Sequence, residues 1–268
     1  MTGPAGAAVV PVPVLPADLD TPCLVVDLDV VEANAARLQA DLDARGVALR
    51  PHVKTHKSVA LAKIQLEAGA GGLTVGTLGE AEVFAAAGLT DLFVAYPVWA
   101  VGAKAGRLRA LHDATGLAVG LDSVAGAERL AAAVAGSRRP LRVLVEVDSG
   151  GHRTGVGGPD EAVVVAGAAR ALGLSVEGVF THGGHSYARP GARHLAAADE
   201  VAVLAVVADA LREAGHEIAI VSAGSTPTMT GAAAGQVTEI RAGTYLLGDR
   251  TQLALGSIPA DSVALHVA

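Results

Sequence analysis

The sequence has little cysteine, few aromatic residues and no long run of one charge. Cys23 is the single cysteine among 268 residues, which excludes an internal disulfide and fits a reducing compartment. Aromatic residues supply only 3% of the chain, so alanine, valine and leucine must fill the core. No basic run exceeds two residues and the net charge is −7, which argues against a nucleic-acid partner but leaves small anionic ligands open.

No segment combines a charged start, an apolar stretch and a cleavage site, as a secretory signal does. The most apolar long segment, 195–214, is interrupted by charged side chains at Asp199, Glu200, Asp209, Arg212 and Glu213. A membrane-spanning helix tolerates such residues poorly. We therefore expect a cytoplasmic, soluble protein without a membrane partner, and a helix at 195–214 that packs on a sheet.

Short runs rich in valine and leucine recur along the chain, with amphipathic helical stretches between most of them. The predicted strands are 47–53, 72–75, 91–95, 117–121, 141–147, 175–181, 217–222 and 237–241. Alternating strands and helices predict a parallel sheet with right-handed crossovers, and eight such units close most simply into a (β/α)₈ TIM barrel. An open doubly wound sheet is the alternative architecture.

Before the first of these strands, the chain is rich in proline, alanine and valine, which follow no helical or strand periodicity. We expect residues 1–20 to form a flexible lead-in. A strand is predicted at 23–28, followed by a helix that Asp29 caps and Gly46 ends. The apolar positions of this helix fall on one face and are Val31, Ala35, Leu38 and Leu42.

Lys54 stands where the strand 47–53 ends and the first long loop begins, which is where barrel enzymes place catalytic groups. A lysine closing an apolar strand is partly desolvated, and Arg50 and Lys57 lie close in sequence. Both effects lower the pKa of an amine and favour a nucleophile that forms a Schiff base with an aldehyde cofactor. Taken alone, a lysine at such a position is more often a solvated side chain at a strand end.

Polar, glycine-containing loops follow four later strands. They are 146–156 with Arg153, 181–187 with His182 and Tyr187, 222–228 with Ser222, Gly224, Ser225 and Thr226, and 241–245 with Arg241, Gly243 and Thr244. The loop 222–228 has the composition of an anion-binding nest, and barrels often bind phosphate after strands seven and eight.

Each loop also has an ordinary interpretation. Gly224-Ser225-Thr226 is compatible with a simple turn, His182 with a histidine satisfied at a strand end, and Arg153 with a surface ion pair to Asp148 or Glu146. No metal site is expected at His182 and His185, because no third ligand is near in sequence. The convergence of five loops on one predicted rim nevertheless favours a functional site.

Several of these motifs together resemble one family of enzymes. They are Thr21-Pro22, the segment 51–57 around Lys54, Glu146-Val147-Asp148 with 153–156, the segment 182–187, and 239–245. They are similar to the D-threonine aldolase and D-serine dehydratase group of fold-type III pyridoxal phosphate (PLP) enzymes, whose barrel is the alanine racemase N-terminal domain. The resemblance runs from about Asp20 to the C-terminus.

The resemblance implies roles for individual residues. Lys54 would hold PLP as a Schiff base and act as the proton-transfer base. Gly224, Ser225 and Thr226, with the amides near Gly243, would bind the phosphate. The site further includes Ser222, Arg241 and Thr244. His182 would lie close to the cofactor ring, and either Tyr187 or Arg153 would approach its pyridine nitrogen.

The chain departs from this group at its C-terminal end. Members of the group carry a second, mostly β domain whose His-x-Cys or His-x-Asp pair holds a divalent metal, zinc or manganese, and neither pair occurs in this sequence. We expect a barrel at 21–245 and the start of a truncated β domain at 246–268. The strand 23–28 is expected to belong to that domain and to lose sheet partners.

The leading functional hypothesis is a PLP-dependent lyase that acts on β-hydroxy D-amino acids, as an aldolase or a dehydratase. One alternative is an amino-acid racemase of the alanine racemase type. Another is a non-catalytic PLP-binding barrel that resembles the PLP homeostasis proteins. A small D-amino acid is the expected partner of the enzyme, and a homodimer is an open alternative to a monomer.

Overall fold

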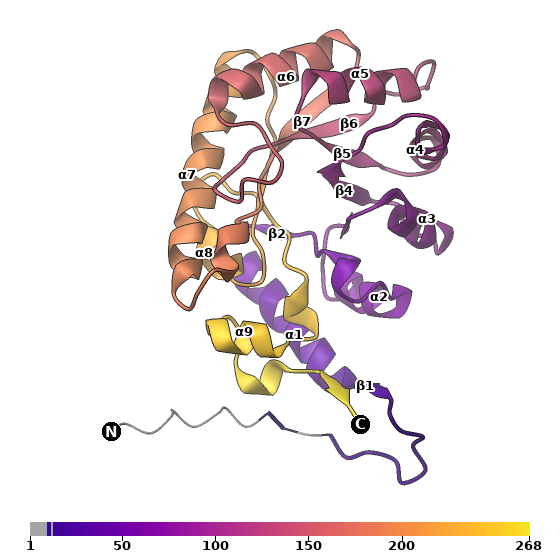
Figure 1. The fold of residues 1–268 in the computed structure, drawn as a ribbon, viewed down its shortest axis with the longest axis vertical. Helices are drawn as coiled ribbons and strands as arrows, with labels where there is room; N and C mark the ends of the chain where they lie inside the picture. Colours follow the sequence, from indigo (N-terminus) through magenta and orange to yellow (C-terminus); the bar gives the residue numbers. More distant parts are fainter. Residues whose placement is uncertain (1–9, 12) are drawn as a thin grey trace.

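The computed structural model describes residues 10–11 and 13–268. Of the predicted lead-in at 1–20, residues 1–9 and 12 lie outside the described residues. The other residues of this segment belong to neither a helix nor a strand. The remaining chain forms a ring of strands surrounded by helices (Figure 1). The barrel strands are β2 (Ala48–Leu49), β3 (Leu73–Val75), β4 (Leu92–Pro97), β5 (Ala118–Leu121), β6 (Arg142–Glu146), β7 (Ser175–Phe180), β8 (Ile220–Ala223) and β9 (Glu239–Ile240).

All neighbouring strands of this sheet are parallel, in the order β2-β9-β8-β7-β6-β5-β4-β3. An isolated parallel bridge between His52 and Thr74 joins the two ends of this order. The Thr74 amide donates to Pro51 O at 2.9 Å across the same junction. The sheet is thus closed, which confirms the predicted barrel and rejects the open doubly wound alternative.

Helices cover the outside of the strands, and four short 3₁₀ turns lie in the connections. The helices are α1 (Leu28–Asp43), α2 (Val59–Glu67), α3 (Leu78–Ala86), α4 (Ala103–Ala114), α5 (Val124–Ala133), α6 (Pro159–Ala171), α7 (Ala192–Glu213), α8 (Met229–Ala232) and α9 (Arg250–Leu255). The 3₁₀ turns are η1 (Val53–Thr55), η2 (Gly184–Tyr187), η3 (Thr244–Leu246) and η4 (Ala260–Ser262).

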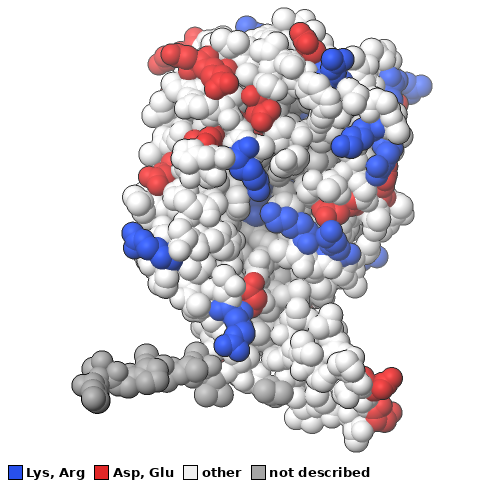
Figure 2. Space-filling view, in the orientation of Figure 1, with Lys and Arg blue, Asp and Glu red and all other residues white. Residues whose placement is uncertain are grey.

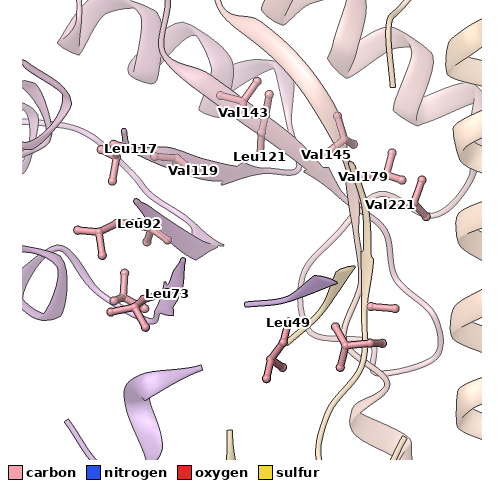
Figure 3. Packing of buried hydrophobic residues seen from close by; sticks show 14 of the residues in the cluster. Leu49, Leu73, Leu92, Leu117, Val119, Leu121, Val143, Val145, Val179 and Val221 are labelled. Carbon is pink, nitrogen blue, oxygen red and sulfur yellow. The ribbon is translucent and has the colours of Figure 1, made fainter. Parts of the chain in front are cut away.

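Two hydrophobic cores follow from the alternation of side chains along the strands. Leucine and valine side chains such as Val143 and Val145 pack between the sheet and the helices (Figure 3). Leu144 points to the other side, into the barrel, where it joins Ala118, Phe93 and Phe180. The two phenylalanine rings meet edge to face, 5.1 Å between centroids. Two of the chain's three phenylalanines thus fill the centre of the barrel.

The first helix begins two residues earlier than predicted. Its N-cap is Asp27, whose carboxylate accepts from the Val30 amide at 3.2 Å, so the predicted cap at Asp29 is wrong. Asp29 lies in the first helical turn instead, where an acidic side chain also suits the helix dipole. The four predicted apolar positions are buried, together with Asn34 and Gln39.

A second, small sheet lies beside α1 and the chain terminus (Figure 1). Strand β1 (Leu24–Val26) pairs antiparallel with β10 (Leu265–Val267). The predicted strand 23–28 therefore has one partner in this structure. No helix within the described residues is long and apolar enough to cross a membrane.

Candidate active site

Lys54 lies in the turn η1, after β2 rather than at its last position. The predicted strand 47–53 is too long, because only Ala48 and Leu49 pair with β9 and His52 contributes a single bridge. The His52 ring caps the turn, with Nδ1 accepting from the Lys54 amide at 3.4 Å. This turn carries the Lys54 amine to the carboxyl end of the barrel strands, as the sequence predicts.

The pKa of Lys54 is lowered, although the residue as a whole is exposed at the mouth of the barrel. Burial of the amine by the surrounding protein is the largest cause, and the charges of Arg153 and Arg241 add to it. The predicted causes, Arg50 and Lys57, are wrong. Lys57 pairs with Glu80 at 3.2 Å, and Arg50 pairs with carboxylates at the amino end of the barrel.

The Lys54 amine opens into a hollow at the end of the barrel. On the face shown in Figure 2, Lys and Arg side chains gather around the hollowed middle. The pocket is lined by His52, Lys54, Thr55, Ala95, Glu146, Arg153, Phe180, His182, Tyr187, Gly224, Ser225, Thr226, Arg241, Gly243 and Thr244.

Of the predicted site residues, Ser222 alone does not line this pocket. Its hydroxyl is fully buried below, where it donates to Glu239 Oε1 at 2.5 Å and accepts from the Arg241 guanidinium. Arg241 also donates to Thr181 O, and its guanidinium lies 5.1 Å from the centre of the Phe180 ring. Ser222 therefore orients Arg241 from beneath rather than facing a ligand.

Two histidines in the pocket are held in their neutral form. Burial lowers the pKa of His182 to about 3, with further contributions from the charges of Lys54 and Arg241. Burial, followed by the charge of Lys54, also lowers the pKa of His52 well below its ordinary value. A neutral imidazole can pack against the flat ring of a ligand without adding positive charge to the pocket. The sequence indicated His182 through its strand-end motif, whereas no role was predicted for His52.

Glu146 is the carboxyl that lines the pocket, and no catalytic or binding role was predicted for it. Its side chain is only 3% exposed, and Oε1 accepts from the Thr154 hydroxyl at 2.8 Å. Burial raises its pKa to about 6 against the opposing effects of Thr154 and the nearby arginines. Oε2 has no hydrogen-bond partner within the described chain. Near neutral pH the pocket thus combines three basic side chains with one weakly acidic group.

The loop after β8 is held by side chains on its inner side. The Ser225 amide donates to Thr228 Oγ1 at 2.9 Å, and Thr226 Oγ1 accepts from the Tyr245 amide at 3.0 Å. In the described part of the chain, the amides of Thr226, Gly243 and Thr244 donate no hydrogen bond. Free amides beside two hydroxyl side chains form a donor set suited to a phosphate.

Arg153 and Tyr187 have different neighbours in the pocket. The Arg153 guanidinium is 5.8 Å from the centre of the Tyr96 ring, on β4. Burial raises the pKa of the Tyr187 phenol, and its hydrogen bonding with Gln252 and Ser225 opposes this rise. Tyr187 therefore lies near Ser225 in the loop after β8, whereas Arg153 lies near Tyr96 on β4.

The sequence missed five residues of the pocket lining: His52, Thr55, Ala95, Glu146 and Phe180. His52, Thr55 and Glu146 belong to strand-end motifs that the sequence did reveal, so their position was the available signal. Ala95 and Phe180 are apolar and carry no such signal. Within the described residues, no cluster of three potential metal ligands was found.

Comparison with known proteins decides the family. The model of the alanine racemase N-terminal domain matches residues 26–251. The chain belongs to the alanine racemase N-terminal domain family. This family assignment agrees with the resemblance seen in the sequence and with the closed barrel.

Members of the family with known activities are closely similar to this chain. The D-threo-3-hydroxyaspartate dehydratase of Delftia sp. (strain HT23) is 43% identical over 255 residues, covering 93% of this chain and 67% of that protein. Its solved structure has a TM-score of 0.84 at 42% identity, over the same shares of the two chains. A D-threonine aldolase of Arthrobacter sp. is 35% identical over 250 residues, covering 89% of this chain and 65% of that protein. The chain spans about two thirds of the length of these relatives.

Proposed function

We propose that this barrel binds PLP, with Lys54 as the residue that carries it covalently. The residues present fit the group. The free amides of Thr226, Gly243 and Thr244 and the hydroxyl of Ser225 supply phosphate donors. A Cβ on Gly243 would lie 2.6 Å from His52 O, so the backbone there approaches its neighbour more closely than any other residue permits. The excess of basic side chains also favours an anion.

The geometry supports a division of roles around the cofactor. Tyr187 lies near Ser225, which supports a role for its hydroxyl beside the phosphate. Arg153 lies near the Tyr96 ring on β4, and we propose that Arg153 rather than Tyr187 serves the pyridine nitrogen. Neutral His182 would pack against the ring. Arg241 is held beneath the pocket by Ser222 and Thr181, where it contributes charge to the site.

The reaction we propose is a lyase reaction on β-hydroxy D-amino acids. The observation that carries it is the Lys54 amine, with a lowered pKa, in a pocket of anion donors at the mouth of this family's barrel. The relatives support the substrate class, since a dehydratase and an aldolase for such compounds are 43% and 35% identical to this chain. Dehydratase and aldolase remain alternatives that the products distinguish.

In this chemistry PLP, when bound, supplies an electron sink for the bond that breaks at Cα. The chain's own groups move the protons. With its pKa lowered, Lys54 as a free amine would be in the form that accepts the Cα proton in a dehydratase. In an aldolase the base instead removes the β-hydroxyl proton, and the Cα–Cβ bond breaks to give glycine and an aldehyde.

A labelling experiment tests the cofactor site first. PLP is added to the purified chain, the visible absorbance is followed, and borohydride reduction is followed by peptide mass analysis. We expect the label on Lys54 in the wild type and in the control K57A, and no label at this position in K54A. Label spread over several exposed lysines, or equal absorbance in K54A, would reject the site.

Product analysis then tests the reaction. D-threo-3-hydroxyaspartate, D-threonine, D-serine and D-alanine are supplied to the PLP-loaded protein with and without added divalent metal. A keto acid and ammonia indicate a dehydratase, glycine and an aldehyde an aldolase, and L-alanine from D-alanine a racemase. Turnover of D-alanine alone would overturn the lyase proposal.

A further inference from the structure

Glu200 is the one acidic residue on the buried face of α7. The other buried positions of this helix are alanine, leucine and valine, and the Glu200 side chain is fully buried among them. Removing a carboxyl group from water costs several kcal/mol unless hydrogen bonds replace the lost hydration. A carboxyl group in an otherwise apolar stripe therefore requires hydrogen-bond donors that compensate for its burial.

The contacts of Glu200 join two loops of the candidate site. Its Oε1 accepts from the Gly183 amide at 2.8 Å and from the Gly224 amide at 3.2 Å. Gly183 follows His182 directly, and Gly224 opens the loop that contains Ser225 and Thr226. A single carboxyl oxygen thus fixes the loop after β7 to the loop after β8.

The backbone at both contacts is shaped to this side chain. A Cβ on Gly183 would lie 2.9 Å from Glu200 Cδ, so a larger residue would displace the carboxyl group. Gly224 has φ +89°, a conformation that residues other than glycine rarely adopt. In this conformation its amide points away from the pocket, toward α7.

The contacts extend further through Thr228. Ser225 N and Ser225 Oγ both lie within hydrogen-bond distance of Thr228 Oγ1, at 2.9 and 3.0 Å. Hydrogen bonding by Thr228 also opposes the rise that burial causes in the pKa of Glu200. Oε2 of Glu200 has no partner with good geometry within the described chain. Glu200 and Thr228 together hold Gly224 and Ser225 from behind.

We propose that Glu200 is a positioning residue that holds the loop Gly224–Thr226 and the His182 loop in one arrangement, so that the phosphate donors converge. The inference rests on the proposed function, because it takes that loop to be the phosphate site. Glu200 acts through the two loops and touches neither cofactor nor substrate. Nothing in this role requires a negative charge, since a neutral carboxyl oxygen or an amide oxygen accepts the same two hydrogen bonds.

The chemistry predicts which substitution is tolerated. Burial favours the neutral form of Glu200, and a neutral acid avoids repulsion of a phosphate bound in front of it. Glutamine has nearly the same shape, its Oε1 accepts both amides, and its Nε2 faces Thr228 as a donor. E200Q should therefore keep the arrangement, whereas E200A removes both acceptors and E200D shortens the side chain by one methylene.

The test compares PLP with pyridoxal, which lacks the phosphate. Binding of each to Lys54 is titrated by absorbance and confirmed by borohydride trapping in the wild type, E200Q, E200D, E200A and the control E213A, an exposed glutamate on the same helix. Misalignment of one phosphate donor, and so the loss of about one hydrogen bond to the phosphate, corresponds to about tenfold in affinity. We expect E200A and E200D to bind PLP about tenfold more weakly and pyridoxal nearly unchanged, and E200Q to bind both like the wild type.

The outcomes separate this inference from the proposed function. A wild type that takes up no PLP on Lys54 would overturn both. A wild type that binds PLP, with E200A and E200D binding it equally well, would overturn the positioning role alone. Equal weakening for PLP and pyridoxal in folded E200D would also overturn it, because that is the result of general destabilisation. Circular dichroism melts identify variants that fail to fold, and E200D then decides in place of E200A.

Discussion

The two ends of the barrel contain similar basic side chains in opposite electrostatic settings. At the amino end, Arg50 contacts Glu239 at 2.7 Å and Asp91 at 2.9 Å, and Arg142 contacts Glu177 at 2.7 Å. At the carboxyl end, Lys54, Arg153 and Arg241 make no ion pair within the described part of the chain. The only acidic group lining their pocket is Glu146, and burial raises its pKa.

The difference separates a structural network from a binding site. At the amino end each guanidinium has a carboxylate, so the charges cancel and join neighbouring strands. At the carboxyl end, burial is the largest cause of the lowered pKa of Lys54, and repulsion from Arg153 and Arg241 adds to it at a cost in stability. Functional sites commonly contain groups with perturbed pKa values, because their charged side chains are arranged to bind a ligand rather than one another. Substitutions at the two ends should therefore change stability with opposite sign.

The largest effect is expected from R50M at the amino end. The variant leaves Glu239 buried, with Ser222 as its remaining partner among the side chains described. Breaking such a pair by removing one member should cost about 3 kcal/mol in the free energy of unfolding. Urea denaturation followed by circular dichroism measures this loss.

A matched substitution on the same end is R142M. The Arg142–Glu177 pair is more exposed, with side-chain exposures of 28% and 29%, so solvent screens it and we expect a loss below about 1 kcal/mol. If R50M and R142M were equally stable, burial would not be what gives the Arg50 network its strength.

The next effect in size is expected from E146Q at the carboxyl end, with the opposite sign. Glu146 has a pKa near 6 in the folded chain against an ordinary value of 4.5. Ionising it in the folded state costs about 2 kcal/mol, which is absent below pH 4.5 and fully present above pH 6. E146Q should therefore be more stable than the wild type by about 2 kcal/mol at pH 8, relative to their difference at pH 4.

The pH dependence makes this prediction specific. Urea midpoints of both proteins are measured from pH 4 to pH 8, without added PLP. A stability difference that stays constant across this range would show that Glu146 ionises normally and that its orphan oxygen is satisfied in solution.

The sequence predicted the barrel well because its signals are local. Each strand is a short valine- and leucine-rich run, and a polar loop follows at the carboxyl end, so Lys54, His182 and the loop 222–228 were found from position alone. The errors have physical reasons. Asp27 and Asp29 flank one residue, and only geometry decides which of them caps α1.

Contacts between distant segments were beyond the sequence. Arg50 and Lys57 are neighbours of Lys54 along the chain, but the groups that lower its pKa are Arg153 and Arg241. The side chain of Ser222 lies on the buried side of β8, where its hydroxyl contacts Arg241 instead of lining the pocket. Glu200 is, in the sequence, one charged residue on a long helix, and its contact with Gly183 and Gly224 exists only after the barrel closes.

The smallest effect on stability, but a decisive one for the comparison, is expected from R153Q. Arg153 is one of the two cations that lower the pKa of Lys54. Removing its charge should raise the Lys54 pKa and leave the free energy of unfolding within about 0.5 kcal/mol of the wild type, as for most substitutions at partly exposed sites. Titration of the Lys54 amine by NMR in lysine-labelled protein gives the pKa directly.

The control is R129Q, because Arg129 lies over the Trp99 ring and is not among the charges that act on Lys54. If R153Q and R129Q both left the Lys54 titration unchanged, Arg153 would not contribute to the lowered pKa, and the contrast in charge between the two ends would act on Lys54 through Arg241 alone.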